Sequence, residues 1–321
     1  MSEVGTMKAG GNGVESSFSI WPHRLALFLA CATFPLLFIG GLVTSLGVGL
    51  AVPDWPTTFG YNMFLYPWSK MIGGIFYEHS HRLVASTVGL VSIALALTFW
   101  FREERPWLRR LGIAALALVV AQGVLGGLRV VLLQQTLAIV HACLAQAFFA
   151  LAVSLALFTS GEWRDQTVAQ PIADGGRLRR LGAITTAMIY LQIVFGAVLR
   201  HSGERLDAHL LIAVLVAIHV ILLLTRITRA HSDQAKLSRP AYFLGMLLLL
   251  QLMLGAASYF GKFTSVLRWP NEAIVVLTTT HLIAGALMLA TSLVITLRAY
   301  RRAALAPASM RAKVLAEHYS V

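Results

Sequence analysis

A series of long apolar runs constrains this chain more than any other feature, because each run is long enough to cross the hydrocarbon core of a bilayer. A spanning helix needs about 20 predominantly apolar residues. Short connections at 131–134 and 201–206 predict that neighbouring helices are antiparallel. We therefore predict eight transmembrane helices. Their approximate bounds are residues 25–46, 72–101, 111–130, 134–159, 180–200, 206–226, 240–261 and 271–299.

The composition supports a membrane protein and argues against a soluble one. The chain of 321 residues is 57% hydrophobic and only 12% charged, whereas soluble domains have about 45–50% apolar and about 25% charged residues. The net charge of +12 is compatible with nucleic-acid binding, but the basic residues gather between the apolar runs. We therefore expect membrane lipid as a partner and no nucleic acid.

The distribution of Lys and Arg predicts the orientation of the helices. Nineteen of the 26 basic residues fall in five segments that share one side of the predicted bundle. Because basic residues concentrate in cytoplasmic loops, we predict that this side is cytoplasmic and that both termini lie there. The expected location is a bacterial cytoplasmic membrane, with the chain as an integral membrane protein.

The expected organisation is an all-α polytopic membrane protein built from two pseudo-symmetric four-helix bundles. The N-terminal bundle is predicted at 25–159 and the C-terminal bundle at 180–300, joined by a cytoplasmic linker at 160–179. The first residues are rich in Gly and Ser without apolar periodicity, so we expect a disordered tail at 1–24. A cytoplasmic tail is expected at 301–321.

Three of the odd-numbered spans repeat a Gln and a Gly near their outer ends, four residues apart. Residues at this spacing lie on one face of a helix. Two compatible interpretations stay open: close helix packing through Gly with Gln bonding across helices, or a face left open for a flat ligand. The first span ends similarly, in Gly40-Gly41. The repeated pairs are Gln122 and Gly126, Gln192 and Gly196, and Gln251 and Gly255.

Each even-numbered span carries a histidine in its outer half, and these histidines lie at a similar depth. Ionisable groups inside a membrane are costly and mark functional sites. Helix bundles place cofactor ligands on facing helices, and neutral imidazole is a common ligand of haem iron. For any one of these histidines, a hydrogen-bonded structural role is the alternative. The four residues are His81, His141, His209 and His281.

A haem explains this pattern better than zinc does. Zinc takes about four close ligands, and no Cys, Asp or Glu cluster accompanies the histidines. Cys31 and Cys143 both lie in apolar runs and predict neither a metal–thiolate site nor a disulfide. Two histidines on opposed helices suit the two axial positions of a planar macrocycle. Arg129 and Arg200, near outer helix ends, are candidate contacts for haem propionates; the alternative is snorkelling to the membrane surface.

The arguments for the other histidines are weaker. His79 precedes His81 by two residues, so on a helix it faces about 200° away. His219 follows His209 by ten residues and is off its face by roughly a quarter turn, which predicts a structural role. The rest lie at membrane edges or in tails: His23, His201, His231 and His318.

The second span begins with Tyr77-Glu78-His79-Ser80-His81-Arg82, directly after the longest outer loop. This loop, residues 47–71, contains Pro53-Asp54-Trp55-Pro56, and loops of this length in compact bundles are usually functional. Glu78 lies three residues before His81 and shares its helix face. Its functional role would be proton transfer or stabilisation of positive charge. Its structural role would be a salt bridge with Arg82 or an outer-loop Lys.

These residues resemble a known family. The pattern Glu78-x-x-His81-Arg82 after a Pro53-Asp54-Trp55-Pro56 loop, with a histidine in each even-numbered span, is similar to the haem A synthase family over residues 25–300. That family oxidises the C8 methyl group of haem O to a formyl group, which gives haem A for terminal oxidases. The resemblance implies haem O as substrate and haem b as cofactor. It also suggests haem O synthase and a quinol or another electron donor as partners.

The resemblance implies a role for each candidate residue. His209 and His281 would be the axial ligands of haem b in the C-terminal half, the cofactor half. His81 and His141 would flank haem O in the N-terminal half, the substrate half, with Glu78 as the catalytic carboxylate. The candidate propionate contacts are Arg82, Arg129 and Arg200.

The chain departs from the family at two places. Many bacterial members have a cysteine pair in the first outer loop, where this chain has Thr57-Thr58 and no cysteine. Many relatives have Arg after the third histidine, where this chain has Leu210. An iron ligated by both His81 and His141 would have no free position for dioxygen, so either one histidine leaves or the oxidation avoids that position. Two further functions stay open: a dihaem b-type electron-transfer protein, and a transporter or channel with polar histidines.

Overall fold

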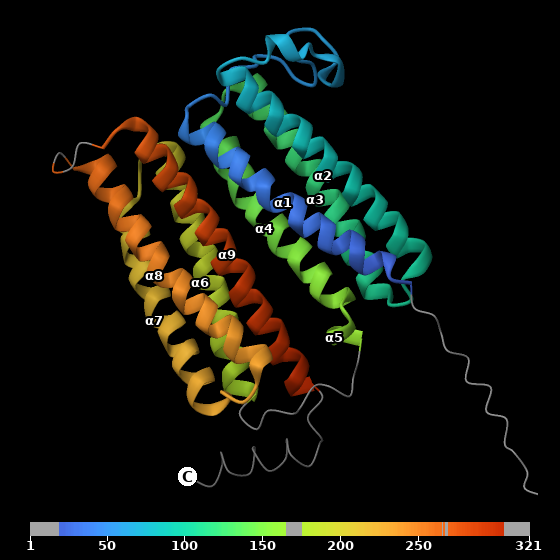
Figure 1. Cartoon of the computed structure of the whole chain (residues 1–321), viewed down its shortest axis with the longest axis vertical. Coiled ribbons are helices and arrows are strands. Elements are labelled where there is room, and N and C mark those ends of the chain that lie inside the picture. Colours follow the sequence, from blue (N-terminus) through green and yellow to red (C-terminus); the bar gives the residue numbers. More distant parts are fainter. Residues whose placement is uncertain (1–18, 165–174, 265, 267–268, 305–321) are drawn as a thin grey trace, which may run out of the picture.

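The computed structural model describes residues 19–164, 175–264, 266 and 269–304 (Figure 1). Eight helices in this part of the chain are long and apolar enough to cross a membrane, which confirms the predicted all-α membrane protein. They are α1 (Trp21–Ser45), α2 (Gly74–Arg102), α3 (Pro106–Leu132), α4 (Gln135–Thr159), α6 (Gly175–Ser202), α7 (Leu206–Ala230), α8 (Ala235–Phe263) and α9 (Asn271–Ala304). The short elements are α5 (Gly161–Arg164) after α4, and the 3-10 turns η1 (Met63–Leu65) and η2 (Trp68–Lys70) between α1 and α2.

Most of the helices extend a few residues beyond the apolar runs, so three domain bounds differ from the prediction. α1 begins at Trp21, inside the predicted tail, with Pro22 in its first turn. Proline suits this position because its fixed φ is helical and the missing N–H would have no intrahelical partner. α6 begins at Gly175 and α9 continues to Ala304, because basic side chains at membrane edges can extend toward water while the helix goes on. The rest of the predicted tails and linker, residues 1–18, 165–174 and 305–321, lies outside the described residues.

The helix contacts define two groups of four, which lie side by side (Figure 1). In the first group, α1 and α3 each pack against α2 and α4; in the second, α6 and α8 each pack against α7 and α9. The groups meet where α9 packs against α1 and α4, and where α4 also contacts α6. This packing agrees with a four-plus-four division of the chain. A two-fold relation between the groups stays a prediction.

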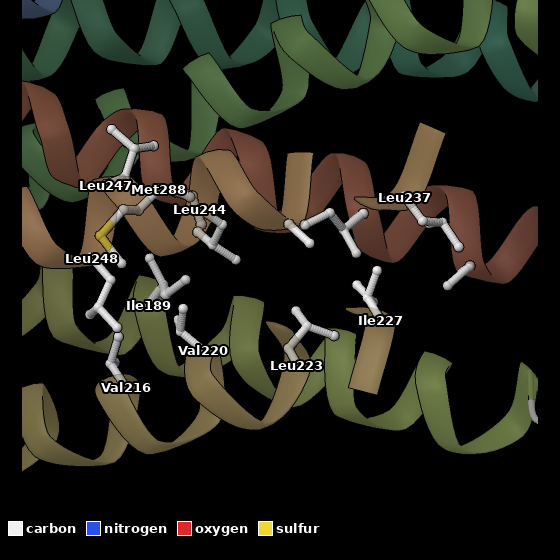
Figure 2. Close-up of a cluster of buried hydrophobic side chains, with 14 of the residues drawn as sticks. Ile189, Val216, Val220, Leu223, Ile227, Leu237, Leu244, Leu247, Leu248 and Met288 are labelled. Carbon is white, nitrogen blue, oxygen red and sulfur yellow. The ribbon is translucent and has the colours of Figure 1, made fainter. Parts of the chain in front are cut away.

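Each group has its apolar core in the halves of the helices that lie nearer the chain termini. In the first group this core includes Leu29, Phe99 and Leu155; in the second it includes Leu223 and Leu244 (Figure 2). Helices in a bilayer associate through van der Waals packing, so these cores fix the positions of the helices. A third cluster lies between the groups and consists of Leu37, Phe149, Ala286 and Ala290. The opposite halves of the groups, which we call the outer halves, are therefore free to collect polar side chains.

An ion pair joins the two groups on the side of the termini. Glu162 of α5 binds Arg298 of α9 through two N–O contacts of 3.0 and 2.9 Å. Arg298 also donates a hydrogen bond to the carbonyl of Lys236 at 2.8 Å. That carbonyl lacks its usual helix partner because the residue four positions later is Pro240, which has no N–H. The guanidinium therefore satisfies a backbone group that the proline leaves unbonded.

Candidate functional site

The four histidines of the even-numbered spans share one packing arrangement. Each imidazole turns its Cε1 edge toward a glycine on the preceding helix, where a side chain would otherwise stand. A Cβ placed on each glycine would approach Cε1 as follows: Gly40 to His81 at 3.0 Å, Gly126 to His141 at 3.4 Å, Gly196 to His209 at 3.2 Å and Gly255 to His281 at 3.1 Å. These glycines of the odd-numbered spans therefore allow the helices to pack closely, and the group that packs against each glycine is an imidazole.

The two histidines of the second group face one another. The ring centroids of His209 and His281 are 6.4 Å apart and their planes are inclined by 68°. An ion bound to one nitrogen of each ring at about 2.0–2.1 Å, with about 1 Å from each nitrogen to its ring centre, requires centroids about 6 Å apart. The observed separation fits an ion held between two imidazoles as axial ligands.

The two histidines of the first group occupy the equivalent helices. His81 is on α2 and His141 on α4, which lie diagonally because both pack against α1 and α3. The two imidazoles are within electrostatic range of one another, and both are within range of Arg129 on α3. The structure therefore brings the predicted N-terminal pair together, with a cation beside it.

Glutamines accompany three of the four imidazoles. The Nε2 of Gln192 lies 3.2 Å from Nδ1 and 3.3 Å from Nε2 of His209. The Nε2 of Gln251 lies 3.4 Å from Nε2 of His281. In the first group, Gln122 donates a hydrogen bond to the backbone carbonyl of His141 at 3.2 Å. These contacts confirm that the Gln residues bond across helices, as one interpretation of the repeat predicted.

Several buried polar atoms at these sites have no hydrogen-bond partner among the residues that the structure describes. They include Nδ1 of His81, His141 and His281 and Oε1 of Gln122, Gln192 and Gln251. Buried polar atoms in proteins are nearly always paired. A concentration of unpaired donors and acceptors around facing imidazoles is the environment that a bound ligand would complete. The residues therefore fit a haem held between two histidines.

Glu78 lies in a buried ion pair at the start of α2, with only 4% of its surface exposed. One oxygen accepts a hydrogen bond from Nη2 of Arg82 at 2.8 Å, and the other accepts from the backbone N–H of Val52 at 3.0 Å. The salt bridge that we predicted as the structural role of Glu78 is therefore present. The carboxylate is also within electrostatic range of Arg129.

Arg82 attaches the outer loop to α2. Its Nη1 donates to the carbonyls of Asp54 at 2.8 Å and Thr57 at 3.1 Å, and its Nη2 also donates to the carbonyl of Val52 at 3.2 Å. With the bond to Glu78, these contacts use the four N–H groups on Nη1 and Nη2. Only the Nε–H of Arg82 is left for a propionate. Its main role in the structure is to hold the loop.

The Pro53-Asp54-Trp55-Pro56 segment packs onto the outer end of the first group. Asp54 accepts hydrogen bonds from the N–H groups of Phe59 and Gly60 and from the hydroxyl of Thr57. Burial favours a raised pKa for Asp54, but the hydrogen bonds from Gly60, Thr57 and Phe59 outweigh it and lower the pKa below its usual value. The ring of Trp55 lies against Gly127 of α3, so that a Cβ there would overlap it.

His79 and His219 have structural contacts. His79 is buried, lies 3.2 Å from the hydroxyl of Thr58 through Nδ1, and packs against the ring of Tyr66 at a centroid distance of 5.1 Å. It therefore faces the loop, away from His81, as predicted. Nδ1 of His219 donates to the carbonyl of Leu215 at 2.8 Å. Of the remaining histidines, His318 lies outside the described residues.

Two residues at the outer end of α6 have contacts that the sequence did not predict. Arg200 donates from Nη2 to the carbonyl of Gly41 at 2.8 Å and to the hydroxyl of Ser45 at 2.6 Å, both on α1. Its Nη1 donates to the carbonyl of Thr278 on α9 at 3.2 Å. His201 is within electrostatic range of Arg129 and His141 in the other group. Both residues therefore connect the two halves, which no spacing along one helix could reveal.

The fold and the site define a class of protein: an eight-helix membrane protein with two histidines near the same end of each four-helix group, which face one another in the second group. Residues 23–208 match the model of the cytochrome oxidase assembly protein family, COX15-CtaA, and the chain belongs to that family. This match includes Glu78, His81 and His141 and ends one residue before His209. The assignment of His209 and His281 therefore depends on their geometry.

Three curated relatives are similar to part of the chain, and each is named heme A synthase. The protein of Alkalihalophilus pseudofirmus is 29% identical over 57% of this chain, and that of Shouchella clausii is 28% identical over 57%. The protein of Symbiobacterium thermophilum is 33% identical over 48% of this chain. The matches cover 62%, 60% and 50% of the relatives' own lengths, respectively.

Proposed function

We propose that this chain is a membrane haem-dependent oxidoreductase that oxidises the C8 methyl group of haem O to a formyl group and so makes haem A. The observation that carries the proposal is the facing pair His209 and His281, 6.4 Å apart between ring centroids, with an equivalent pair in the family-matched half. The three relatives are named heme A synthase, which supports a role in haem A synthesis over the parts of those proteins that match.

In this proposal the two halves have different tasks. His209 and His281 would hold haem b, and His81 and His141 would flank haem O. A bound haem supplies the redox chemistry of its iron. Arg129 is within electrostatic range of His81 and His141, and Arg200 is within range of His281. Each arginine is therefore placed to offer a cation to the propionates of the haem in its half.

The proposed role of Glu78 is to accept a proton from the substrate or to stabilise positive charge at the oxidised carbon. The change from methyl to formyl replaces two hydrogen atoms by one oxygen atom, and with dioxygen as the oxidant the second oxygen atom leaves as water. The bonds from Arg82 and Val52 fix the carboxylate at the outer end of the first group. Glu78 lies about one helical turn before His81 on α2.

A second candidate function is a dihaem b-type electron-transfer protein without methyl oxidation. The observation that favours it is that both oxygens of Glu78 are bonded, to Arg82 and to the backbone of Val52. A carboxylate that only anchors the loop would need no chemical role. This candidate predicts reversible reduction of two haems by quinol and no new porphyrin product.

Conversion of haem O in membranes tests the proposal. The protein is produced in cells that make haem O and no haem A, and the extracted haems are separated by chromatography. We expect haem A to appear with the wild type and to be lost in Glu78→Gln, with the b-type absorbance retained. Glu104→Gln, an exposed glutamate near the opposite end of α2, is the matched control and should still give haem A. Haem O that persists unchanged beside a folded, haem-loaded wild type would overturn the proposal in favour of electron transfer.

We also propose the orientation and the partners. The first and last described helices begin and end on the same side of the bundle (Figure 1), and the excess of Lys and Arg on that side supports cytoplasmic termini in a bacterial cytoplasmic membrane. Haem O synthase, as the source of substrate, and a quinol or another electron donor are the proposed partners.

A further inference from the structure

The four histidine sites differ in one neighbour. On α3, α6 and α8, the residue four positions before the glycine that contacts the imidazole is a glutamine. On α1, the residue four positions before Gly40 is Leu36. Because residues four apart share a helix face, Leu36 takes the place beside His81 that a glutamine takes beside each of the other three imidazoles.

A carboxamide beside a metal-binding imidazole has a definite task. A histidine that binds a metal through Nε2 carries its proton on Nδ1, and it almost always donates that proton to a neighbouring acceptor. This hydrogen bond fixes the tautomer and the ring orientation and makes the imidazole a stronger ligand. An imidazole without such an acceptor is a weaker ligand and leaves a buried donor unpaired.

The donors and the acceptors that would form these bonds are both present and unpaired. Nδ1 of His141 and of His281 and Oε1 of Gln122, Gln192 and Gln251 are buried without partners among the residues that the structure describes. At His209, the carboxamide nitrogen of Gln192 is 3.2 Å from Nδ1 and 3.3 Å from Nε2, and at His281 that of Gln251 is 3.4 Å from Nε2. A half turn of either carboxamide exchanges its oxygen and nitrogen, so that Oε1 then accepts the N–H of the ring nitrogen that does not bind iron. Gln122 instead donates to the backbone carbonyl of His141 at 3.2 Å.

His81 has no carboxamide beside it that could accept a hydrogen bond from its ring. Its Nδ1 is buried and unpaired within the described part of the chain, and the leucine at position 36 offers no polar atom. Its ring is also the most closely packed of the four, because a Cβ on Gly40 would lie 3.0 Å from Cε1. Of the four imidazoles, His81 is therefore the one with least support as a ligand.

We propose that Gln192 and Gln251 are positioning residues whose side-chain oxygens accept a ring N–H of His209 and His281, that Gln122 positions His141 through its backbone carbonyl, and that His81, which has no such partner, would be the ligand that leaves. This inference rests on the proposed function, since it takes a haem in each half. Only the N-terminal half would then have a histidine that can leave, whereas His209 and His281 would both stay in place. A haem in the N-terminal half would therefore be the one that an external ligand could reach.

Binding of carbon monoxide to the reduced, full-length, haem-loaded protein tests the proposal, because this probe requires an open coordination position. In the wild type we expect one of two haems to react. Leu36→Gln supplies the missing acceptor and should lower the reactive fraction several-fold. Gln251→Leu should raise the fraction above one haem per chain and shift the reduction potential of the second haem upward. Gln146→Leu, which removes a buried glutamine on α4 that lies five residues beyond His141, is the matched control and should change neither quantity.

The outcomes separate this inference from the proposed function. If Leu36→Gln does not fold, the potential shift in Gln251→Leu still decides the question. Two bound haems whose carbon monoxide reactivity and potentials are the same in wild type, Leu36→Gln and Gln251→Leu would overturn the inference alone. A folded wild type that binds no haem would overturn the proposed function and the inference together.

Discussion

Glycine-to-alanine substitutions beside the imidazoles provide a graded test of the histidine sites. In Gly255→Ala, the new methyl group would lie 3.1 Å from Cε1 of His281, whereas carbon atoms in contact normally stay about 3.5–4.0 Å apart. The ring must therefore retreat by several tenths of an ångström or the helices must separate. In Gly126→Ala the distance to His141 is 3.4 Å, which is close to ordinary contact.

The size of the effect follows from the cost of overpacking. An extra methyl group in a packed interior costs about 1–3 kcal/mol. If that cost falls on the orientation of the ligand, haem affinity in the affected half decreases by about 5- to 150-fold. Among the three imidazoles that stay in place, we expect the loss in the order Gly255→Ala, Gly196→Ala and Gly126→Ala, following distances of 3.1, 3.2 and 3.4 Å.

Haem titration of the purified apoprotein, followed by the Soret absorbance, measures these affinities. Gly123→Ala on α3 is the matched control, because a Cβ there meets no described atom within 4 Å. Alanine favours a helix over glycine by about 1 kcal/mol, so this control should bind haem normally and melt at the same or a higher temperature. Wild-type affinity in Gly255→Ala, or a larger loss in Gly126→Ala than in Gly255→Ala, would refute the reasoning.

Three further predictions concern the loop and the connection between the halves. Arg82→Ala removes one partner of a buried ion pair with Glu78, which should cost about 3–5 kcal/mol and make residues 52–57 sensitive to limited proteolysis; an equally resistant loop would contradict the contacts. Hydrogen bonds lower the pKa of Asp54 in the folded loop. The Asp54 carboxylate therefore stabilises the loop fully above the pKa that Asp54 has in the unfolded chain, and this stabilisation is lost as the pH falls through the pKa that it has in the folded protein. Loop proteolysis should therefore rise below about pH 4 in the wild type and lose this acid step in Asp54→Asn, and an unchanged step would show that another group causes it. Glu162→Gln leaves Arg298 without its anion and should lower stability by about 1 kcal/mol, measured by thermal melting, whereas an unchanged melting temperature would show that the pair does not join the halves.

Helix number was predictable from the sequence because a bilayer imposes a minimum apolar length on each span. Helix ends were less predictable. From the sequence, Pro22 could have been the end of a tail or the start of a helix. The structure shows that it lies in the first turn of a helix that begins at Trp21. The start of α6 at Gly175 was missed because the basic residues that follow it are as typical of a loop as of a helix end.

The candidate ligands were predictable because histidine is rare in hydrocarbon and each even-numbered span has at least one. The sequence also identified the Gln and Gly repeat, but not that the glycines contact the imidazoles. That contact joins two helices, and the pattern along one helix cannot specify its neighbour. For the same reason, the sequence left two roles open for Glu78, and only the structure shows the bonds to Arg82 and Val52.

The connection between the halves was not predictable. Arg200 appeared in the sequence as a residue near a helix end, suited to a propionate or to the membrane surface. In the structure it donates to Gly41 and Ser45, which are more than 150 residues away along the chain. His201, which we placed at the membrane edge, is within electrostatic range of His141 in the other half.

The pyridine-haemochrome spectrum of the purified protein tests the central claim, that paired histidines hold haem, most directly. We predict a b-type spectrum in the wild type that is lost in both His209→Ala and His281→Ala, and retained in His219→Ala, whose ring donates to a backbone carbonyl. A folded wild type without a Soret band, when haem supply is ample, would contradict the account and favour a transporter or channel with polar histidines.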